Sequence, residues 1–128
     1  MDYYYYDNTP NNLENYKGED INDCVCRAIS GGLNIDYGYV NKLLEYTSRE
    51  YNCPKLCVCC YIHLLQDIFG FPTIYVTKYK TVQDIAKSHS NNIVIIRCDN
   101  HLTWSYHGKI MDKFDCSNYR VTHYWIIE

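Results

Sequence analysis

The feature that most constrains the fold is an apolar run in the second half of the chain, Ile93–Cys98, bounded by Asn91-Asn92 and Asp99-Asn100. A strand with one face in water alternates apolar and polar residues. This run is instead apolar at successive positions, and so on both faces. It therefore predicts the central strand of a sheet that is buried on both sides.

Further strands are predicted before and after this run. His107-Gly108 suits the two-residue turn of a type I′ hairpin, in which both central residues have positive φ. Alternating, β-branched or aromatic residues mark the strands themselves. The predicted strands cover residues 73–77, 101–106, 109–114 and 119–127.

The first predicted helix carries a cysteine in its first turn. Asn22 and Asp23 offer cap side chains, residues 24–29 are mostly apolar, and a glycine pair at 31–32 ends the helix. This places Cys24 beside the backbone N–H groups that a helix start leaves without partners.

Three more helices are predicted. Apolar spacing favours helices over residues 36–51 and 56–69, and Thr81 and Asp84 form a capping-box pattern that opens a short helix to about Ser88. Because most helices precede most strands, we expect an α+β fold with N-terminal helices packed on a small, mostly antiparallel sheet.

Composition indicates one packed domain. The chain has 128 residues, of which 47% are hydrophobic and 21% charged. We expect a single domain over 20–128, preceded by a tyrosine-rich arm over 1–19 that has no sustained period. The net charge of −3 provides no basic face for phosphates, so neither nucleic acid nor a membrane is expected as a partner.

The chain is expected in the cytoplasm. Its first residues lack the basic and apolar regions of a signal peptide, and no run approaches the roughly 18 apolar residues of a spanning helix. A reducing compartment does not keep structural disulfides. The eight cysteines are therefore expected as free thiols that fill the core, bind metal or act as a nucleophile.

One combination of residues predicts chemistry: Cys24 at a helix start, His101 at a strand start, and acids on the next strand. A helix start lowers the pKa of a thiol, an imidazole takes its proton, and a third group orients the imidazole. In the hairpin register, His101 faces Phe114 and shares its sheet face with Asp112, the preferred orienting residue. A one-residue bulge would give that role to Asp115.

Short motifs in this order resemble those of short, papain-like cysteine peptidase-fold proteins encoded by bacteriophages. Residues 23–29, Asp-Cys-Val-Cys-Arg-Ala-Ile, resemble the family's Asp-Cys-x-x-Arg-Ala-Ile opening. Residues 100–117 are similar to its His, hairpin Gly and Asp-x-x-Asp stretch, and Tyr124-Trp125 to its terminal aromatic pair. The resemblance spans about residues 20–127. It implies that Cys24 is the nucleophile and His101 the base, with Asp112 or Asp115 in the third role.

The same resemblance implies a papain-like fold and a thiol hydrolase or acyl transferase. Such a protein acts on a peptide, isopeptide or related amide bond, and its protein or peptide substrates include host proteins. The Cys24 backbone N–H and Asn22 are the candidate oxyanion donors, since Gly18 stands where larger papain-like peptidases carry Gln. No cofactor and no metal are expected, and Cys26, about 200° round the helix, is predicted to pack.

The alternative belongs to another functional class. The chain would then be a catalytically silent papain-fold protein that binds and inhibits a host defence protein. Small size, an acidic balance, many aromatic residues and the missing glutamine favour this alternative.

A second group of candidate ligands comprises Cys53, Cys57, Cys59, Cys60 and His63. Structural zinc sites usually draw two ligand pairs from separate elements, and only half of that pattern is present. On one continuous helix, Cys59 and His63 share a face, whereas Cys57 and Cys60 share another. Core packing is therefore predicted ahead of metal binding.

Overall fold

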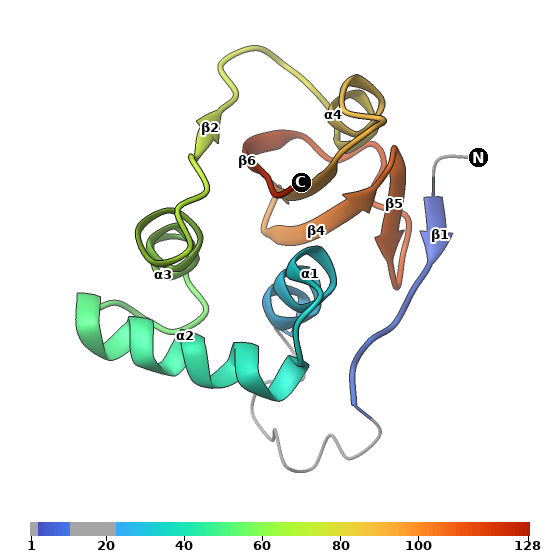
Figure 1. Ribbon diagram of the computed structural model, residues 1–128. Helices are drawn as coiled ribbons and strands as arrows, with labels where there is room; N and C mark the ends of the chain where they lie inside the picture. The colour runs from blue at the N-terminus through green and yellow to red at the C-terminus, as the bar shows by residue number, and fades with distance from the viewer. Residues whose placement is uncertain (1–2, 11–22) are drawn as a thin grey trace.

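The computed structural model describes residues 3–10 and 23–128, which form a six-stranded sheet with helices on both faces (Figure 1). The strand order is β1-β5-β4-β3-β6-β2. The expected domain boundary at residue 20 lies outside the described residues. The elements are β1 (Tyr3–Tyr5), α1 (Cys24–Leu33), α2 (Tyr37–Tyr51), α3 (Val58–Ile62), the π-helical η3 (His63–Ile68), β2 (Ile74–Tyr75), α4 (Val82–Ser88), β3 (Ile93–Cys98), β4 (His101–Tyr106), β5 (Lys109–Asp112) and β6 (Val121–Ile126).

Strand β3 confirms the prediction of a central strand buried on both faces. It pairs antiparallel with β4 on one side and with β6 on the other. Ile95 belongs to the apolar cluster on one face of the sheet, and Val94 and Ile96 belong to the cluster on the other. The two-residue period of a strand thus supplies both halves of the core from one apolar run.

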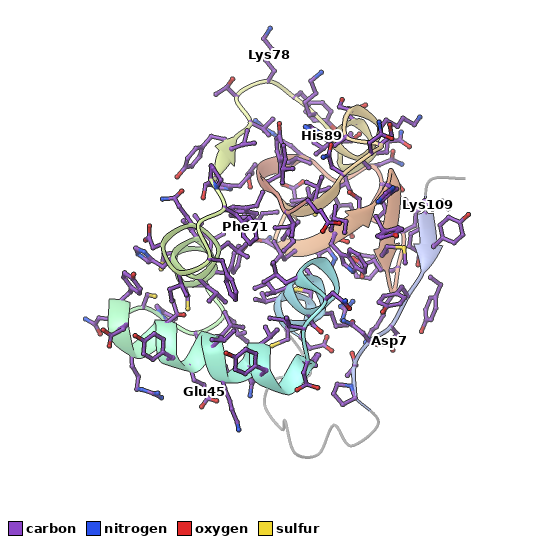
Figure 2. The ribbon with its side chains drawn as sticks, in the orientation of Figure 1. Asp7, Glu45, Phe71, Lys78, His89 and Lys109 are labelled. Atoms are coloured by element: carbon purple, nitrogen blue, oxygen red, sulfur yellow. The ribbon has the colours of Figure 1, made fainter. Side chains whose placement is uncertain are left out.

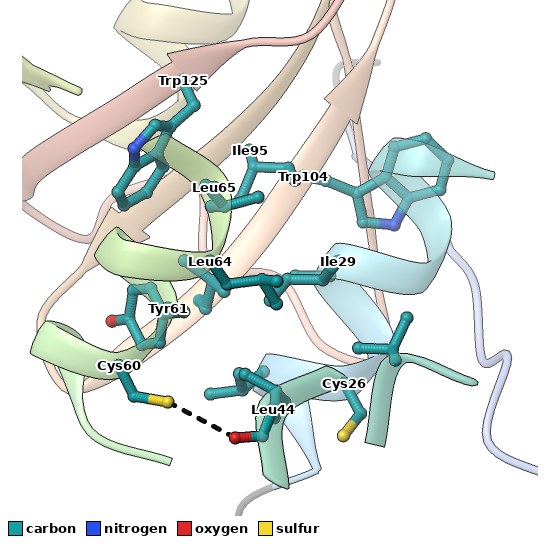
Figure 3. Close-up of a cluster of buried hydrophobic side chains, with 14 of the residues drawn as sticks. Cys26, Ile29, Leu44, Cys60, Tyr61, Leu64, Leu65, Ile95, Trp104 and Trp125 are labelled. Carbon is teal, nitrogen blue, oxygen red and sulfur yellow. Dashed lines mark hydrogen bonds between the residues drawn. The ribbon is translucent and has the colours of Figure 1, made fainter. Parts of the chain in front are cut away.

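The larger cluster joins α1, α2 and the α3–η3 segment to one face of the sheet. Figure 3 shows part of this cluster, with Ile29 of α1, Leu44 of α2 and Leu64 of η3 on the helix side and Trp104 and Trp125 on the strands. These five side chains are almost entirely buried, so both tryptophans are core residues.

The smaller cluster lies under α4 on the opposite face (Figure 1). Val82 and Ala86 of α4 pack in it with residues of β3 and β5. The predicted capping box is present: Thr81 Oγ1 accepts from the backbone N–H of Asp84, and the Asp84 carboxylate accepts from the backbone N–H of Thr81.

The glycine pair does not end the first helix as predicted. α1 continues to Leu33 and ends at Asn34, which has the left-handed φ of 56°. Gly31 and Gly32 lie inside the helix where it packs against the sheet: an added Cβ on Gly31 would lie 2.3 Å from the Trp104 indole. The glycines therefore permit close approach of helix and strand.

The third predicted helix is shorter and irregular. Cys57 is its extended N-cap residue, with φ −82° and ψ 161°, so the helix begins at Val58 and not at Leu56. The second half is π-helical, with the Phe69 N–H donating to the Leu64 carbonyl. Apolar spacing located this segment but did not distinguish α from π geometry. The second helix agrees with its prediction, and the Asp36 side chain caps it by accepting from the backbone N–H of Tyr39.

The described part of the N-terminal arm contributes a strand. β1 pairs in parallel with β5 and forms one edge of the sheet, beside it in Figure 1. The strand expected over 73–77 is reduced to β2 at the other edge.

The residues on either side of β2 differ in their surroundings. In Figure 2, Lys78 points away from the body of the molecule, whereas Phe71 lies between the helices and the sheet.

The hairpin follows its predicted register. Tyr106 pairs with Lys109 and Trp104 with Met111, without a bulge in these pairs. His107 and Gly108 have φ of 50° and 85°, the two positive values that a type I′ turn requires. The antiparallel pairs outnumber the single parallel one among the described strands, in agreement with an α+β fold. None of the helices in the described ranges has the length and apolar character needed to cross a bilayer.

The close packing of α1 on β4 gives a stability prediction. Gly31→Ala should lower the free energy of unfolding by about 1–3 kcal/mol because the new methyl group overlaps the Trp104 indole. Helix propensity alone would change stability in the opposite direction. Urea denaturation measures the difference.

The double variant with Trp104→Leu is the control, because the smaller side chain makes room for the methyl group. The cost of Gly31→Ala should shrink in that background. An equal cost in both backgrounds would contradict the packing argument.

Candidate active site

Cys24 is the first residue of α1 and lies half-buried at a cleft of about 270 Å³. Its thiol is hydrogen-bonded to the His101 side chain and to the backbone of Leu102. The cleft is lined by Cys24, Val25, Leu56, Cys57, Val58, Tyr61, Arg97, Asn100, His101 and Leu102. The nucleophile and base predicted from the sequence therefore line one cleft.

A larger hollow of about 490 Å³ lies near the other end of α1, where Gly31 and Trp104 are among its lining residues. It contains none of the three candidate catalytic residues. The smaller cleft is the candidate active site, despite its lower volume, because Cys24 and His101 line it.

His101 begins β4 directly after a tight turn. Asn100 has φ 50°, a left-handed value that Asn tolerates well, and Cys98 and His101 pair across the turn. His101 is 8% exposed, and its ring is 4.7 Å from the Phe114 ring, centre to centre. The pairing of β4 with β5 ends at Trp104 and Met111, but the His101 and Phe114 rings still face each other beyond it, as the predicted register implies.

Asp112 ends β5 and contacts the imidazole. Its Oδ2 lies 2.7 Å from His101 Nε2. With Nε2 held by the carboxylate, Nδ1 is the ring nitrogen left for the Cys24 thiol. Asp115 is exposed, and its carboxylate accepts from the backbone N–H and hydroxyl of Ser117. The structure therefore brings Asp112, and not Asp115, to His101.

Arg27 connects the two buried carboxylates of the site. Its Nη1 donates to Asp112 Oδ1 at 2.9 Å, and its Nε donates to Asp23 Oδ1 at 3.1 Å. Asp23 also accepts from the Thr9 hydroxyl at 2.6 Å. The prediction that the Asp23 side chain caps the helix is therefore wrong, since it makes no cap hydrogen bond. The bridge fixes the start of α1 to the end of β5.

Sequence reasoning gave Arg27 no role, although a signal was present. Asp23 and Arg27 stand four residues apart, the spacing of an ion pair on one helix face, within an otherwise apolar segment. The contact with Asp112 could not be predicted from spacing, because 85 positions separate the two residues.

The electrostatics of the site favour a thiolate and an imidazolium. Burial alone would raise the pKa of Cys24, but hydrogen bonds from His101 and the Leu102 backbone hold it below its usual value. Burial would lower the pKa of His101, but Asp112, Cys116 and Cys24 raise it to about 11. Burial would also raise the pKa of Asp112, but His101 lowers it to about 2. All three shifts stabilise the charged forms.

A second thiol, Cys116, adjoins the imidazole, which sequence analysis did not anticipate. Its Sγ lies 3.6 Å from Asp112 Oδ2, and its pKa is lowered to about 6, first by the Cys98 thiol and then, against burial, by His101. Cys116 is fully buried, whereas Cys24 lines the cleft. Of these two thiols, Cys24 is the one that a substrate can reach.

Cys26 is completely buried in the larger cluster, as predicted. Gly18 and Asn22, the positions considered for the oxyanion, lie outside the described residues.

No protein-family model, curated protein or solved structure matches this chain.

The buried bridge gives the second prediction. Arg27→Met should reduce the free energy of unfolding by about 3–5 kcal/mol, because it leaves Asp23 and Asp112 buried without their shared cation. Denaturant unfolding at neutral pH measures the loss.

Arg49→Met is the matched control, since Arg49 is exposed in the last turn of α2. Its effect should stay within about 0.5 kcal/mol. If Arg27→Met lowered the free energy of unfolding as little as Arg49→Met, the bridge would not stabilise the fold.

Proposed function

We propose that this chain is a papain-like thiol hydrolase or acyl transferase that acts on a peptide, isopeptide or related amide bond. The observation that carries the proposal is the connected set in one cleft: Cys24 at the start of α1, hydrogen-bonded to His101, which Asp112 holds from the other side. A thiol, a base and an orienting carboxylate are the parts that nucleophilic catalysis at a carbonyl needs.

The proposed substrate class and its cellular location come from the sequence motifs. They resemble phage-encoded members of the papain-like group, so the proposed substrate is a protein or peptide in the host cytoplasm. The α1 helix packed on β4, with the thiol at the helix start and the base at the strand start, supports this assignment.

In the first half-reaction, the Cys24 thiolate attacks the carbonyl carbon of the amide. A carbon–sulfur bond forms, and the carbonyl oxygen takes up negative charge, with the Cys24 backbone N–H as its proposed donor. The His101 imidazolium then gives its Nδ1 proton to the leaving amine as the carbon–nitrogen bond breaks. The product of this step is an S-acyl group on Cys24 and a neutral imidazole.

In the second half-reaction, a water molecule or an amine attacks the acyl carbon and gives its proton to His101 Nδ1. The carbon–sulfur bond breaks, and the thiolate–imidazolium pair returns. Water gives hydrolysis and an amine gives acyl transfer. Asp112 stays ionised throughout, because its bonds to Arg27 and His101 hold its pKa low.

The pH dependence of Cys24 alkylation tests the activated pair. Iodoacetamide reacts with the thiolate, so Cys24 should be modified well below the free-thiol pKa of about 8.5. In His101→Ala the lowering hydrogen bond is lost while burial remains, so the profile should shift to higher pH. Mass spectrometry of the peptide that contains Cys24 gives both profiles.

Cys59 is the internal control within the same reduced, metal-free sample. It is exposed, and hydrogen bonding to Cys57, then burial and Cys53, raise its pKa to about 12. Its modification should require alkaline pH in both proteins. Identical profiles for Cys24 and Cys59 would refute the activated pair.

The second candidate function is a catalytically silent protein that binds and inhibits a host defence protein. Exposed tyrosines at both edges of the sheet favour it: Tyr5 on β1 is 70% exposed, and Tyr75 on β2 is 63% exposed. Tyrosine supplies a large amphipathic contact area at low entropic cost, which suits a protein interface.

Cys24→Ser separates the two functions. In an enzyme the substitution should abolish amide-bond turnover and the effect on host cells, because the hydroxyl is a far weaker nucleophile. In a silent inhibitor the effect should persist, and Tyr75→Ala should weaken it instead. Host-cell growth with each variant expressed gives the comparison.

A further inference from the structure

Three cysteines other than the candidate nucleophile Cys24 converge at one place. Cys53 follows α2, Cys57 is the N-cap residue of α3, and Cys59 lies in its first turn. Their sulfur atoms all lie within 4.8 Å of one another. We propose that Cys53, Cys57 and Cys59 bind one Zn²⁺ or another thiophilic divalent ion.

The convergence follows from the local backbone and corrects the sequence-based grouping. On a continuous helix, Cys57 would share a face with Cys60. Cys57 is instead extended and precedes the helix, so helical spacing does not direct its side chain toward the face of Cys60. Its sulfur lies 2.7 Å from the Cys59 sulfur. Asn52, with φ 51°, turns the chain after α2 and places Cys53 beside them.

The other two candidate ligands have different contacts. The Cys60 thiol is buried and points to the Leu44 carbonyl, 3.7 Å away, as the dashed line in Figure 3 shows. The His63 ring stacks on Tyr51 at 4.0 Å, and its Nδ1 lies 2.6 Å from the Asp67 carboxylate. The site therefore has three sulfur ligands.

The donor set selects the class of ion. The three ligands are sulfurs, which suit zinc, cadmium and similar soft ions and not calcium or magnesium. At a Zn–S distance of about 2.3 Å, tetrahedral sulfurs lie about 3.8 Å apart. The Cys57 and Cys59 sulfurs must therefore separate by about 1 Å, which the exposed Cys59 side chain can provide by rotating.

Charge also favours a cation at this place. Three thiolates this close together repel one another, and a divalent cation between them would offset that repulsion. On binding, three S–H bonds are replaced by three metal–sulfur bonds, and three protons pass to solvent. With three protein ligands, a tetrahedral ion would take a solvent molecule as its fourth ligand, which the exposure of Cys59 permits.

The site adjoins the candidate active-site cleft. Cys57 lines that cleft together with Leu56 and Val58. A bound ion would tie the end of α2 to the start of α3 and so fix this wall. Metal binding does not depend on the proposed catalytic function, and the two can fail separately.

Titration of the full-length protein with Cd²⁺ tests the proposal. The metal-free, reduced protein should bind one Cd²⁺, with the ultraviolet sulfur-to-cadmium charge-transfer intensity of three thiolates, and a large excess of Zn²⁺ should displace it. Cys53→Ser, Cys57→Ser and Cys59→Ser should each lower the affinity by more than about tenfold. Circular dichroism confirms that each variant is folded.

Cys24→Ser and Cys116→Ala are the controls. The second removes a thiol from the His101–Asp112–Cys116 group, whose ligand atoms also lie within 4.8 Å of one another. Both controls should bind Cd²⁺ like the parent protein. Loss of binding in either control, unchanged binding in Cys59→Ser, or no stoichiometric binding in the parent protein would overturn the proposal.

Discussion

The structure depends on satisfying one buried carboxylate. Asp112 is 2% exposed, and an ionised carboxylate at such a position is costly unless cations and N–H groups surround it. Arg27 and the Lys113 backbone N–H bind one oxygen, and His101 binds the other. Arg27 also binds Asp23. The interactions that offset the desolvation of Asp112 therefore also fix the start of α1 against the end of β5.

The chemistry of the cleft follows from this arrangement. Asp112 holds the His101 ring by Nε2, which leaves Nδ1 for the thiol at the helix start. The imidazole is close to two thiols, Cys24 and Cys116, and burial separates their accessibility: Cys116 is enclosed in the core, whereas Cys24 opens to the cleft. Packing, and not the intrinsic reactivity of cysteine, determines which sulfur is a candidate nucleophile.

Much of the sheet and part of the site could be predicted from the sequence because local patterns encode them. Ile93–Cys98 and the His107-Gly108 turn fix a central strand and a hairpin register, which together put His101 and Asp112 on one face. Helix geometry was less predictable. The extended Cys57 and the π-helical turn after it break the regular spacing, so the convergence of its thiol with Cys53 and Cys59 could not be predicted.

The sequence by itself determined the elements whose signals are local: strand period, turn residues, caps and the placement of a thiol at a helix start. Only the tertiary structure decided which distant groups meet. Arg27 reaches Asp112 across 85 positions, and position 31 in the helix has no room for a side chain because the Trp104 indole occupies the space beside it. The physical reason is that the partners of a buried charge, and the groups packed against an indole ring, come from segments distant in the sequence. Which segments meet depends on how the whole chain packs.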